Sequence, residues 1–355
     1  MIAFVAMVAL VALAAVLRMP WRVVVAMLAI LWAGVVLAHL LLPEGHAISR
    51  AAGGSWQSWL VAGAAVALAI GYRAVLGRLR QRAGAVPADG VGGAAPGGAF
   101  SAAELERYAR HIVLRELGGP GQRRLRSARV LVLGAGGLGS PVLMYLAAAG
   151  VGTLGVVDDD TVSLSNLQRQ ILHGDDRLGM PKVLSAEIAL KAINPHVAIR
   201  PCNRRLDAGT GAALFAEYDL ILDGTDNFET RALANRLAVA LGKPLVSGAI
   251  TQWEGQLSVY DPARGGPCLA CIFPEAPAAG LAPDCSIAGV VGALPGVIGS
   301  MMALEAIKII AGAGEPLRGR MLIYDALYGE NRVVSLKPRD GCPVCGGRHE
   351  TARGA

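Results

Sequence analysis

A glycine turn between two apolar runs is the first place in this sequence where chemistry could occur. The run from Val130 to Leu133 leads directly into Gly134, Gly136 and Gly139, which are spaced G-x-G-x-x-G. The second run ends at Asp158, nineteen positions after Gly139. Glycine lets the backbone turn tightly and approach a phosphate, which the amide groups of the turn and the following helix then stabilise. The pattern predicts a nucleotide site with Asp158 on the ribose, although an ordinary strand-to-helix turn can have the same spacing.

Charged and amide side chains after this unit could complete such a site. Asp160 alternates with Asp158, so both carboxylates point the same way from an extended chain. Asp226 follows the apolar run 219–222 in the string DGTDN, at the carboxyl end of a predicted strand, where ligands of open α/β sheets bind. The remaining polar candidates lie between these acids: Asn166, Gln168, Arg169 and Lys182.

Four of the six cysteines form two pairs with identical spacing. Cys268-x-x-Cys271 and Cys342-x-x-Cys345 each lie beside Pro and Gly, and therefore in turns. Four thiolates on two such turns match a tetrahedral structural zinc site. We expect zinc rather than disulfides, because a domain that faces the cytosol is kept reduced.

The other two cysteines stand apart from this pattern. Cys202 lies beside a predicted strand, and we expect an inert buried thiol there. Cys285 lies in a loop rich in Gly, Ala and Pro, residues 278–292. A reactive thiol and an ordinary loop cysteine fit that position equally well.

Strands and helices alternate from about residue 100 onward. The sequence predicts helices over 101–114, 182–193, 228–241 and 295–310, and strands over 130–133, 154–157, 219–222 and 244–247. Ser101 and Glu104 form a capping box for the first helix. The alternation predicts an α/β fold with a doubly wound, Rossmann-like parallel sheet. Antiparallel additions to this sheet are expected over 254–260, 321–325 and 332–336.

The first hundred residues have a different composition. Long apolar runs cover 2–17, 23–42 and 59–76, and the second is long enough to cross a hydrocarbon core of roughly 30 Å as a helix. We expect a membrane region over residues 1–82, with two to three transmembrane helices. A flexible linker rich in Gly, Ala and Pro follows over 83–99. A buried helical core of a soluble domain is the alternative for the same runs.

The placement of arginine predicts an orientation. Seven Arg against Glu44 and Asp89 give residues 1–100 a net charge of +5, out of +6 for the whole chain. Arginines follow the first and third runs, and three crossings put both groups on the cytoplasmic side. We therefore expect the inner (cytoplasmic) membrane, with the domain over 100–355 facing the cytoplasm. That domain is nearly neutral, which argues against a nucleic-acid partner.

Longer strings between about Leu105 and Gly346 resemble the MoeB/ThiF/HesA family, adenylyltransferases that activate ubiquitin-like sulfur-carrier proteins and are related to ubiquitin-activating enzymes. The strings are RYARHIVL, GAGGLGSPV, VDDDTVSLSNLQRQ, PKVLSAE, INPH, DGTDNFETR, VSGAITQWEGQ, the two C-x-x-C pairs and GVIGSMMALEAIK. The resemblance implies a homodimer that uses ATP and Mg²⁺ to adenylate the C-terminal glycine of a small carrier protein, for molybdenum cofactor or thiamine biosynthesis. LVSGA and WEGQ resemble the molybdopterin branch more than the thiamine branch.

The resemblance also implies roles for individual residues. Gly137 would lie against the phosphates, Asp158 would hold the ribose, Asp226 would bind magnesium, and Arg110 would reach into the partner subunit's site. The implied nucleotide-binding set is Gly134, Gly136, Gly137, Asp158, Asp160, Ser165, Asn166, Leu167, Gln168, Arg169, Lys182, Asp226 and Asn227. The implied catalytic set is Arg110, Arg169, Lys182 and Asp226, and the implied zinc ligands are Cys268, Cys271, Cys342 and Cys345. Cys285 aligns with a loop cysteine on which some relatives form a covalent carrier intermediate.

Elementary electrostatics agrees with these roles. Attack of a carboxylate on the α-phosphate brings two anions together, so the site must supply positive charge to the transition state. Arg169, Lys182 and an incoming Arg110 could supply it. Asp160 and Asp226, at adjacent strand ends, offer the hard oxygen ligands that Mg²⁺ prefers.

Two other functions use part of the same pattern. A nicotinamide-dependent oxidoreductase would need the glycine turn and Asp158 but not Arg169, Lys182 or Asp226. A membrane-anchored scaffold with a degenerate nucleotide fold would need none of the charged residues, all of which are present.

Overall fold

The chain consists of two compact units, Met1–Pro87 and Ala88–Ala355, in this computed structural model. The structure describes residues 10, 21–43, 46–83, 99–275 and 289–346. The boundary between the units falls inside the stretch 83–99 that composition predicts as a linker.

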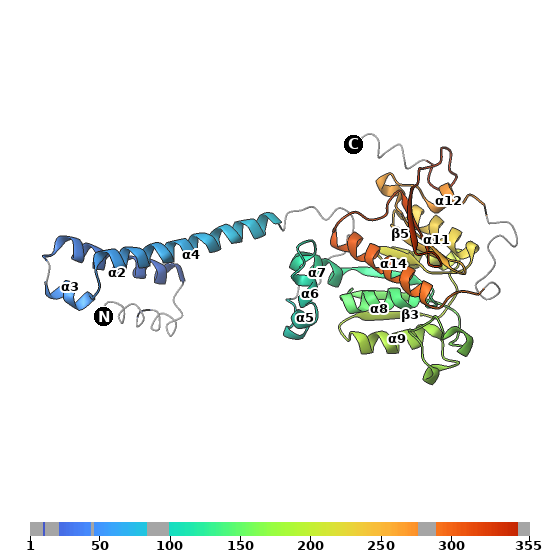
Figure 1. The fold of residues 1–355 in the computed structure, drawn as a ribbon, viewed down its shortest axis with the longest axis horizontal. Coiled ribbons are helices and arrows are strands. Elements are labelled where there is room, and N and C mark those ends of the chain that lie inside the picture. The colour runs from blue at the N-terminus through green and yellow to red at the C-terminus, as the bar shows by residue number, and fades with distance from the viewer. Residues whose placement is uncertain (1–9, 11–20, 44–45, 84–98, 276–288, 347–355) are drawn as a thin grey trace. The chain divides into compact units, whose positions relative to one another are not determined.

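The described part of the N-terminal unit contains helices α2 (Trp21–Leu41), α3 (Ala47–Ala52) and α4 (Trp56–Ala83) (Figure 1). Trp32 of α2 donates from its ring nitrogen to the Trp59 carbonyl oxygen of α4 at 2.8 Å. A Cβ atom on Gly63 would collide with the Trp32 ring, so the missing side chain lets the two helices pack closely.

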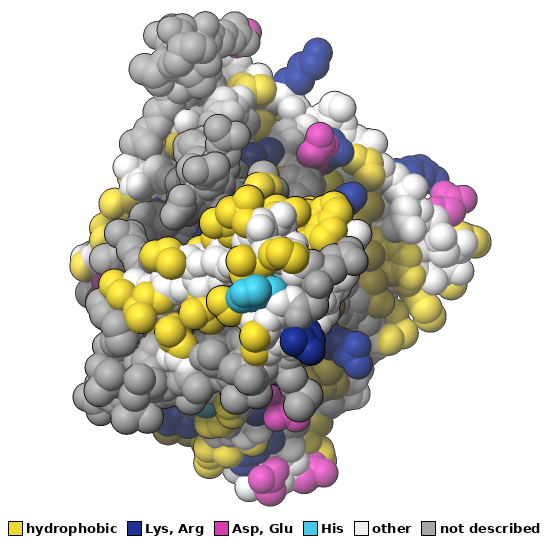
Figure 2. All heavy atoms as spheres, turned by 90° about the vertical axis from the view of Figure 1, so that its left-hand side faces the viewer, with side chains coloured by type: hydrophobic (Ala, Val, Ile, Leu, Met, Phe, Trp, Pro, Cys, Tyr) yellow, Lys and Arg dark blue, Asp and Glu magenta, His cyan; other side chains and the backbone are white. Residues whose placement is uncertain are grey.

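The surface of this unit is apolar. Ile30 and Leu68 are 74% and 78% exposed, and Figure 2 shows hydrophobic side chains gathered on the face turned to the viewer. Among the described residues, one helix is long and apolar enough to cross a membrane: α14 (Ala293–Ala311) of the second unit, more than half of which is buried. The described apolar stretches of the N-terminal helices are shorter, Met27–Leu41 and Trp56–Leu68. The structure therefore does not support the expected N-terminal transmembrane helices, and the first apolar run lies almost wholly outside the described residues.

An eight-stranded mixed sheet forms the centre of the second unit, with strand order β3-β2-β1-β4-β5-β6-β7-β8. The strands are β1 (Arg129–Leu133), β2 (Thr153–Val157), β3 (Ala198–Cys202), β4 (Leu220–Asp223), β5 (Leu245–Ile250), β6 (Glu254–Tyr260), β7 (Arg320–Asp325) and β8 (Glu330–Ser335). The five strands from β3 to β5 are parallel, and β6, β7 and β8 add antiparallel. The predicted α/β fold with a parallel sheet and antiparallel additions is confirmed.

Helices cover both faces of the parallel part of the sheet (Figure 1). They are α5 (Ala102–Arg107), α6 (Ala109–Ile112), α7 (Gly118–Ser127), α8 (Gly139–Ala149), α9 (Lys182–Ile193), α10 (Ala208–Ala216), α11 (Phe228–Ala240), α12 (Leu269–Ile272) and α14. Val130 and Val132 of β1 pack in the core shared with α8, α9 and α14, and Leu131 and Leu133 pack in the core shared with α10 and α11. Burial on both faces explains why this strand has an unbroken apolar run.

The first helix of the domain differs from the prediction. It starts with the predicted capping box of Ser101 and Glu104, but it breaks at Tyr108 into α5 and α6. The Tyr108 ring is buried against Gly150, and its hydroxyl accepts from Asn194 Nδ2 at 2.8 Å. These tertiary contacts fix Tyr108 in a non-helical conformation. Helices α7 and α10 were not predicted.

Candidate functional site

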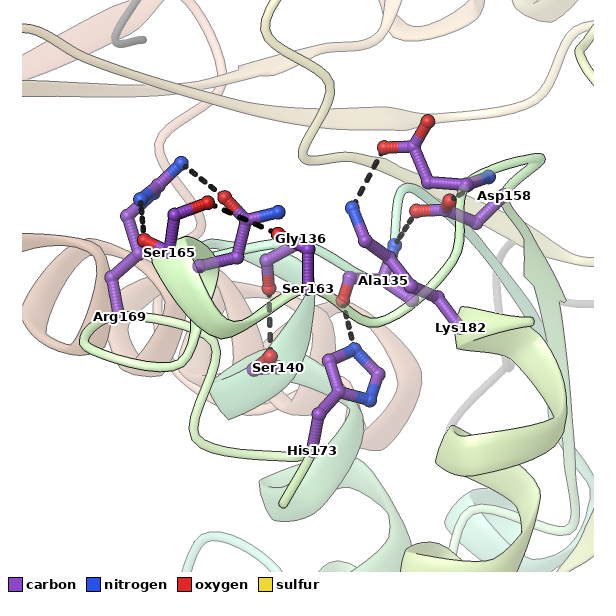
Figure 3. A network of polar contacts seen from close by, with 11 residues as sticks. Ala135, Gly136, Ser140, Asp158, Ser163, Ser165, Arg169, His173 and Lys182 are labelled. Atoms are coloured by element: carbon purple, nitrogen blue, oxygen red, sulfur yellow. Dashed lines mark hydrogen bonds and ion pairs between the residues drawn. The ribbon is translucent and has the colours of Figure 1, made fainter. Parts of the chain in front are cut away.

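The glycine turn lies where the strand order reverses. β1 pairs with β2 on one side and with β4 on the other, so the carboxyl ends of these three strands meet. Open α/β sheets bind ligands at this kind of switch point. Figure 3 shows the polar side chains that gather there.

Two glycines shape the turn itself. Gly134 has φ of 89°, a left-handed conformation that side chains disfavour. A Cβ atom on Gly139 would collide with the Gly134 carbonyl oxygen, so only glycine permits α8 to start this close to β1. Ser140 Oγ donates to the Gly136 carbonyl oxygen at 2.7 Å and closes the first helical turn. A helix start after such a turn favours an anion, because the first amide groups of a helix lack partners within the helix.

Asp158 follows β2, and both of its carboxylate oxygens accept backbone hydrogen bonds. Oδ2 accepts from the Ala135 amide at 2.7 Å, and Oδ1 accepts from the Asp160 amide at 2.9 Å. Burial raises the pKa of Asp158, and the nearby charge of Lys182 opposes this shift. One oxygen from each of Asp158, Asp159 and Asp160 lies within 4.8 Å of the others. Asp158 thus joins the glycine turn to the acidic strand end.

Lys182 is the first residue of α9, and its side chain is only 4% exposed. Its ammonium group lies 2.7 Å from Asp160 Oδ2, and its amide donates to the Asp160 carbonyl oxygen at 2.9 Å. An isolated bridge between Thr161 and Pro181 fixes the two segments side by side. Local backbone pairing therefore places the lysine charge at the end of β2.

Arg169 reaches the turn from the other side (Figure 3). Its guanidinium donates to Asn166 Oδ1 at 3.0 Å and to the Ser165 carbonyl oxygen at 3.5 Å, across the short helix η1 (Leu164–Asn166). A Cβ atom on Gly137 would lie 3.6 Å from Arg169 Cγ, so the arginine stem lies against the glycine turn. Between these residues, Leu167 is half-buried and Gln168 is exposed.

Asp226 and Asn227 follow β4, next to the same turn. A Cβ atom on Gly134 would lie 3.2 Å from the Gly224 carbonyl oxygen, which shows how close the two strand ends are. Asp226 is exposed. Asn227 caps α11, because its Oδ1 accepts from the Thr230 amide at 2.9 Å. The DGTDN loop therefore lies beside the glycine turn, with the Asp226 side chain exposed.

Sequence reasoning missed three buried polar residues beside the turn. Asp223 accepts from the amide and hydroxyl of Thr225 and from Ser247 Oγ, and so shapes the DGTDN loop. Gln170 and His173 are 5% and 7% exposed. A buried carboxylate at a strand end could have pointed to Asp223, but a lone Gln or His carries no spacing signal.

One predicted catalytic residue is not brought to this turn. Arg110 is exposed on α6, and within the described chain it has no hydrogen bond or ion pair with the other predicted residues. Cys285 lies outside the described residues.

The four predicted zinc ligands do meet. The Sγ atoms are 3.8 Å apart for Cys268 and Cys271, 3.7 Å for Cys268 and Cys342, and 3.3 Å for Cys271 and Cys345. All four are buried and none is in a disulfide. A tetrahedral zinc ion with Zn–S bonds of about 2.3 Å holds its sulfurs about 3.8 Å apart, so the cluster fits zinc.

A hydrogen bond from a neighbouring helix positions this cluster. Asn235 of α11 accepts from the Leu269 amide at 3.0 Å and so positions the first pair of cysteines. Burial, together with the neighbouring Cys271, raises the pKa of Cys268 to about 11. A raised pKa means that the Cys268 sulfur loses its proton only when a cation is beside it, and metal binding to four such sulfurs would supply that cation.

A family model matches residues 108–344, and its description is the ThiF family. The chain belongs to the ThiF family. This match includes the glycine turn and three of the four clustered cysteines, and it ends one residue before Cys345. It agrees with the family that the sequence motifs resemble.

The ThiF-family domain is also similar to curated proteins. It is 48% identical over 247 residues to the sulfur carrier protein adenylyltransferase of Thermus thermophilus, covering 68% of this chain and 91% of that protein. It is 48% identical to the SAMP-activating enzyme E1 of Haloferax volcanii, and the match covers 70% of this chain and 91% of that protein. It is 49% identical to the probable adenylyltransferase/sulfurtransferase MoeZ of Mycobacterium tuberculosis, and the match covers 70% of this chain and 64% of that protein.

Solved structures share the fold of this ThiF-family chain. E. coli MccB, in a crystal structure with MccA-N7isoASN, matches with a TM-score of 0.60 at 22% identity, covering 70% of this chain and 75% of that chain. The crystal structure of PaaA matches with a TM-score of 0.59 at 22% identity, covering 67% of this chain and 75% of that chain.

Proposed function

We propose that this ThiF-family chain uses ATP to adenylate the C-terminal glycine of a ubiquitin-like sulfur-carrier protein. The observation that carries the proposal is that Arg169 and Lys182 lie on either side of one glycine turn. Relatives with 48–49% identity are named adenylyltransferases or activating enzymes. Their names favour adenylyl transfer over hydride transfer or a scaffold role.

The turn would bind the nucleotide and the flanking cations would act on the reacting phosphate. Gly137 and the amides at the start of α8 would contact phosphate, and Asp158 would accept from ribose hydroxyls. Arg169 and Lys182 would neutralise the charge that builds up as a carboxylate attacks the α-phosphate. Lys182 must then exchange Asp160 for a phosphate oxygen, which its terminal ammonium group can do by rotation.

Asp226 and Asp160 would hold Mg²⁺. Both carboxylates are exposed and follow the carboxyl ends of β2 and β4, the strands on either side of β1, and both offer the hard oxygen ligands that this ion prefers. The bound ion would add positive charge at the phosphates and orient the leaving pyrophosphate.

A second copy of the chain would complete the site. Apolar side chains are exposed on segments around the nucleotide turn and on α14: Leu164, Ile171, Leu184, Ile188 and Leu304. A homodimer would cover such a surface. Arg110, exposed on α6, would then reach the partner subunit's nucleotide.

The carrier would be the small subunit of molybdopterin synthase, with the thiamine sulfur carrier as the second candidate. The relative MoeZ is named both an adenylyltransferase and a sulfurtransferase. A covalent bond of Cys285 to the carrier remains a separate proposal, because adenylation in the molybdopterin branch does not require that thiol.

The N-terminal helices would anchor the domain at the cytoplasmic face of the inner membrane. The exposed apolar side chains of α2 and α4 support this proposal, as do the arginines that follow the apolar runs. The anchor leaves the chemistry of the ThiF-family domain unchanged.

Mass spectrometry of candidate carriers tests the proposed function. Each carrier is incubated with the full chain, ATP and Mg²⁺, and its intact mass is compared with that of a carrier lacking the final glycine. We expect AMP to be added to the first and not to the second. Carrier-independent turnover of ATP, or a cofactor-dependent absorbance change with NADH, would contradict the proposal.

A further inference from the structure

His173 is a buried residue that contacts both the glycine turn and helix α9. Its ring Nε2 lies 2.8 Å from the carbonyl oxygen of Ala135, in the glycine turn. Its Nδ1 lies 2.8 Å from Ser185 Oγ, on α9. Figure 3 shows the ring directly below the turn.

The partners of His173 determine its tautomer. A carbonyl oxygen can only accept, so Nε2 must carry the proton and donate it to Ala135. In the neutral ring Nδ1 then accepts from the Ser185 hydroxyl. Burial lowers the pKa of His173, and the charges of Lys182 and Arg177 lower it further, while the bond to Ala135 opposes the shift. The ring is therefore neutral near pH 7, and its two bonds are complementary.

The Ala135 residue is consequently held at both of its polar groups. Its amide donates to Asp158 Oδ2 at 2.7 Å, and its carbonyl accepts from His173. The amide belongs to the peptide group between Gly134 and Ala135, and the carbonyl belongs to the peptide group between Ala135 and Gly136. Neither peptide group can rotate without breaking one of these two hydrogen bonds. The direction of the next amides in the turn, which face the phosphates, depends on this orientation.

The second hydrogen bond of His173, to Ser185, connects the ring to α9, the helix that starts at Lys182. Ser185 lies three positions after Lys182 on α9, and His173 lies four positions after Arg169 in the chain. One imidazole therefore sets the distance between the glycine turn, the helix that starts at Lys182 and the segment that carries Arg169.

We propose that His173 is a positioning residue for ATP: it orients the peptide group between Ala135 and Gly136 so that the glycine turn presents its amides to the phosphates. This proposal rests on the proposed use of ATP at the same turn. His173 itself touches no reacting atom, and its effect passes through Ala135 and Ser185.

Two substitutions separate this role from simple packing. In His173→Gln the terminal amide nitrogen can occupy the position of Nε2 and still donate to Ala135. In His173→Asn the shorter amide reaches only the position of Nδ1, towards Ser185, and the Ala135 carbonyl loses its donor. Both variants lose the ring, so both lose similar packing.

The experiment measures ATP binding calorimetrically, with Mg²⁺ and without carrier, on the full chain well below its melting temperature. We expect His173→Asn to raise Kd for ATP about tenfold, and His173→Gln to stay within about twofold of the wild type, at similar melting temperatures. In steady state, the Asn variant should raise KM for ATP, whereas KM for the carrier stays unchanged. His196→Asn, the same change at an exposed histidine, is the matched control.

Equal ATP affinity in the wild type and His173→Asn would overturn the positioning role, as would equal losses in the Asn and Gln variants. Failure of the wild type to bind ATP would instead refute the proposed function. The two ideas therefore fail in distinguishable ways.

Discussion

Lys182 and Asp160 form an ion pair of 2.7 Å in which the lysine side chain is 4% exposed and the aspartate side chain is 67% exposed. The lysine stem is thus part of the domain's interior, while its charged end meets Asp160 just past the carboxyl end of β2. The ion pair holds the Lys182 ammonium group near Asp158, where the sequence predicts that phosphates bind. Because the acid is solvated, exchanging it for another anion costs little.

Replacing Lys182 with Met tests the role of this charge. Methionine keeps an apolar stem in the buried position and removes the ammonium group, so we expect a stability change within about 1 kcal/mol. We expect carrier-dependent exchange of pyrophosphate into ATP to fall about 100-fold or more. Lys191→Met, on an exposed position of the same helix, is the control and should be fully active. Exchange by Lys182→Met within twofold of the wild type would remove Lys182 from the catalytic set.

The substitution Asp226→Asn should abolish adenylation without unfolding the domain. Asp226 is exposed, so the amide should change the free energy of unfolding by no more than about 0.5 kcal/mol. A neutral amide binds Mg²⁺ far more weakly than a carboxylate does, and we expect at least about a 100-fold loss of activity. Activity is measured against Mg²⁺ concentration, with the exposed Glu229→Gln as the control. Unchanged activity at low Mg²⁺ would show that another residue binds the ion.

The parts of the fold that follow from local pattern were predicted correctly. Strand β1 can be predicted from the sequence because burial of both faces requires an unbroken apolar run. The glycine turn can be predicted because the backbone geometry requires Gly134 and Gly139. The four cysteines are readable because a metal site needs fixed spacing. The signal for the strand, the turn and each cysteine pair lies within a few consecutive residues, although the two cysteine pairs meet across 74 positions.

Features that depend on distant partners were not predicted. Tyr108 breaks the first helix because its hydroxyl bonds with Asn194, 86 positions away. His173 takes its role from Ala135, 38 positions before it. The sequence gives no sign of either pair, since the fold alone brings them together. Apolar composition likewise predicted membrane spans at the N-terminus that the described helices do not support.

Loss of one cysteine should release the metal from the buried cluster. We expect Cys342→Ser to lower zinc content from about one ion per chain to near zero, and to destabilise the domain by several kcal/mol. Elemental analysis and thermal unfolding measure the two effects. Cys202→Ser is the control, because Cys202 is half-buried and lies outside the cluster. Full zinc content in the Cys342 variant would contradict a four-cysteine site.

His173 should make stability depend on pH in a defined direction. Burial lowers the pKa of the folded His173 below the value of about 6.5 in the unfolded chain, so the unfolded chain binds more protons as the pH falls. The stability contributed by the neutral ring is complete above about pH 6.5 and is lost as the pH falls through the folded pKa. We expect the free energy of unfolding to fall more between pH 7.5 and 5 in the wild type than in His173→Gln. Urea denaturation at both pH values measures this, and parallel curves for the two proteins would contradict a neutral buried ring.

A shortened chain that starts at Phe100 should be soluble and should adenylate the carrier as fast as the full chain does. The reason is that the ThiF-family domain has its own core on both faces of the sheet, and the capping box of Ser101 and Glu104 starts its first helix. In cell fractionation we expect the full chain in the membrane pellet and the shortened chain in the supernatant, because only the full chain carries the exposed apolar surface of α2 and α4. Aggregation and inactivity of the shortened chain would mean that the N-terminal helices stabilise the domain. Recovery of the full chain in the supernatant would refute the anchor while leaving adenylation intact, so the location of the enzyme and its chemistry are tested separately.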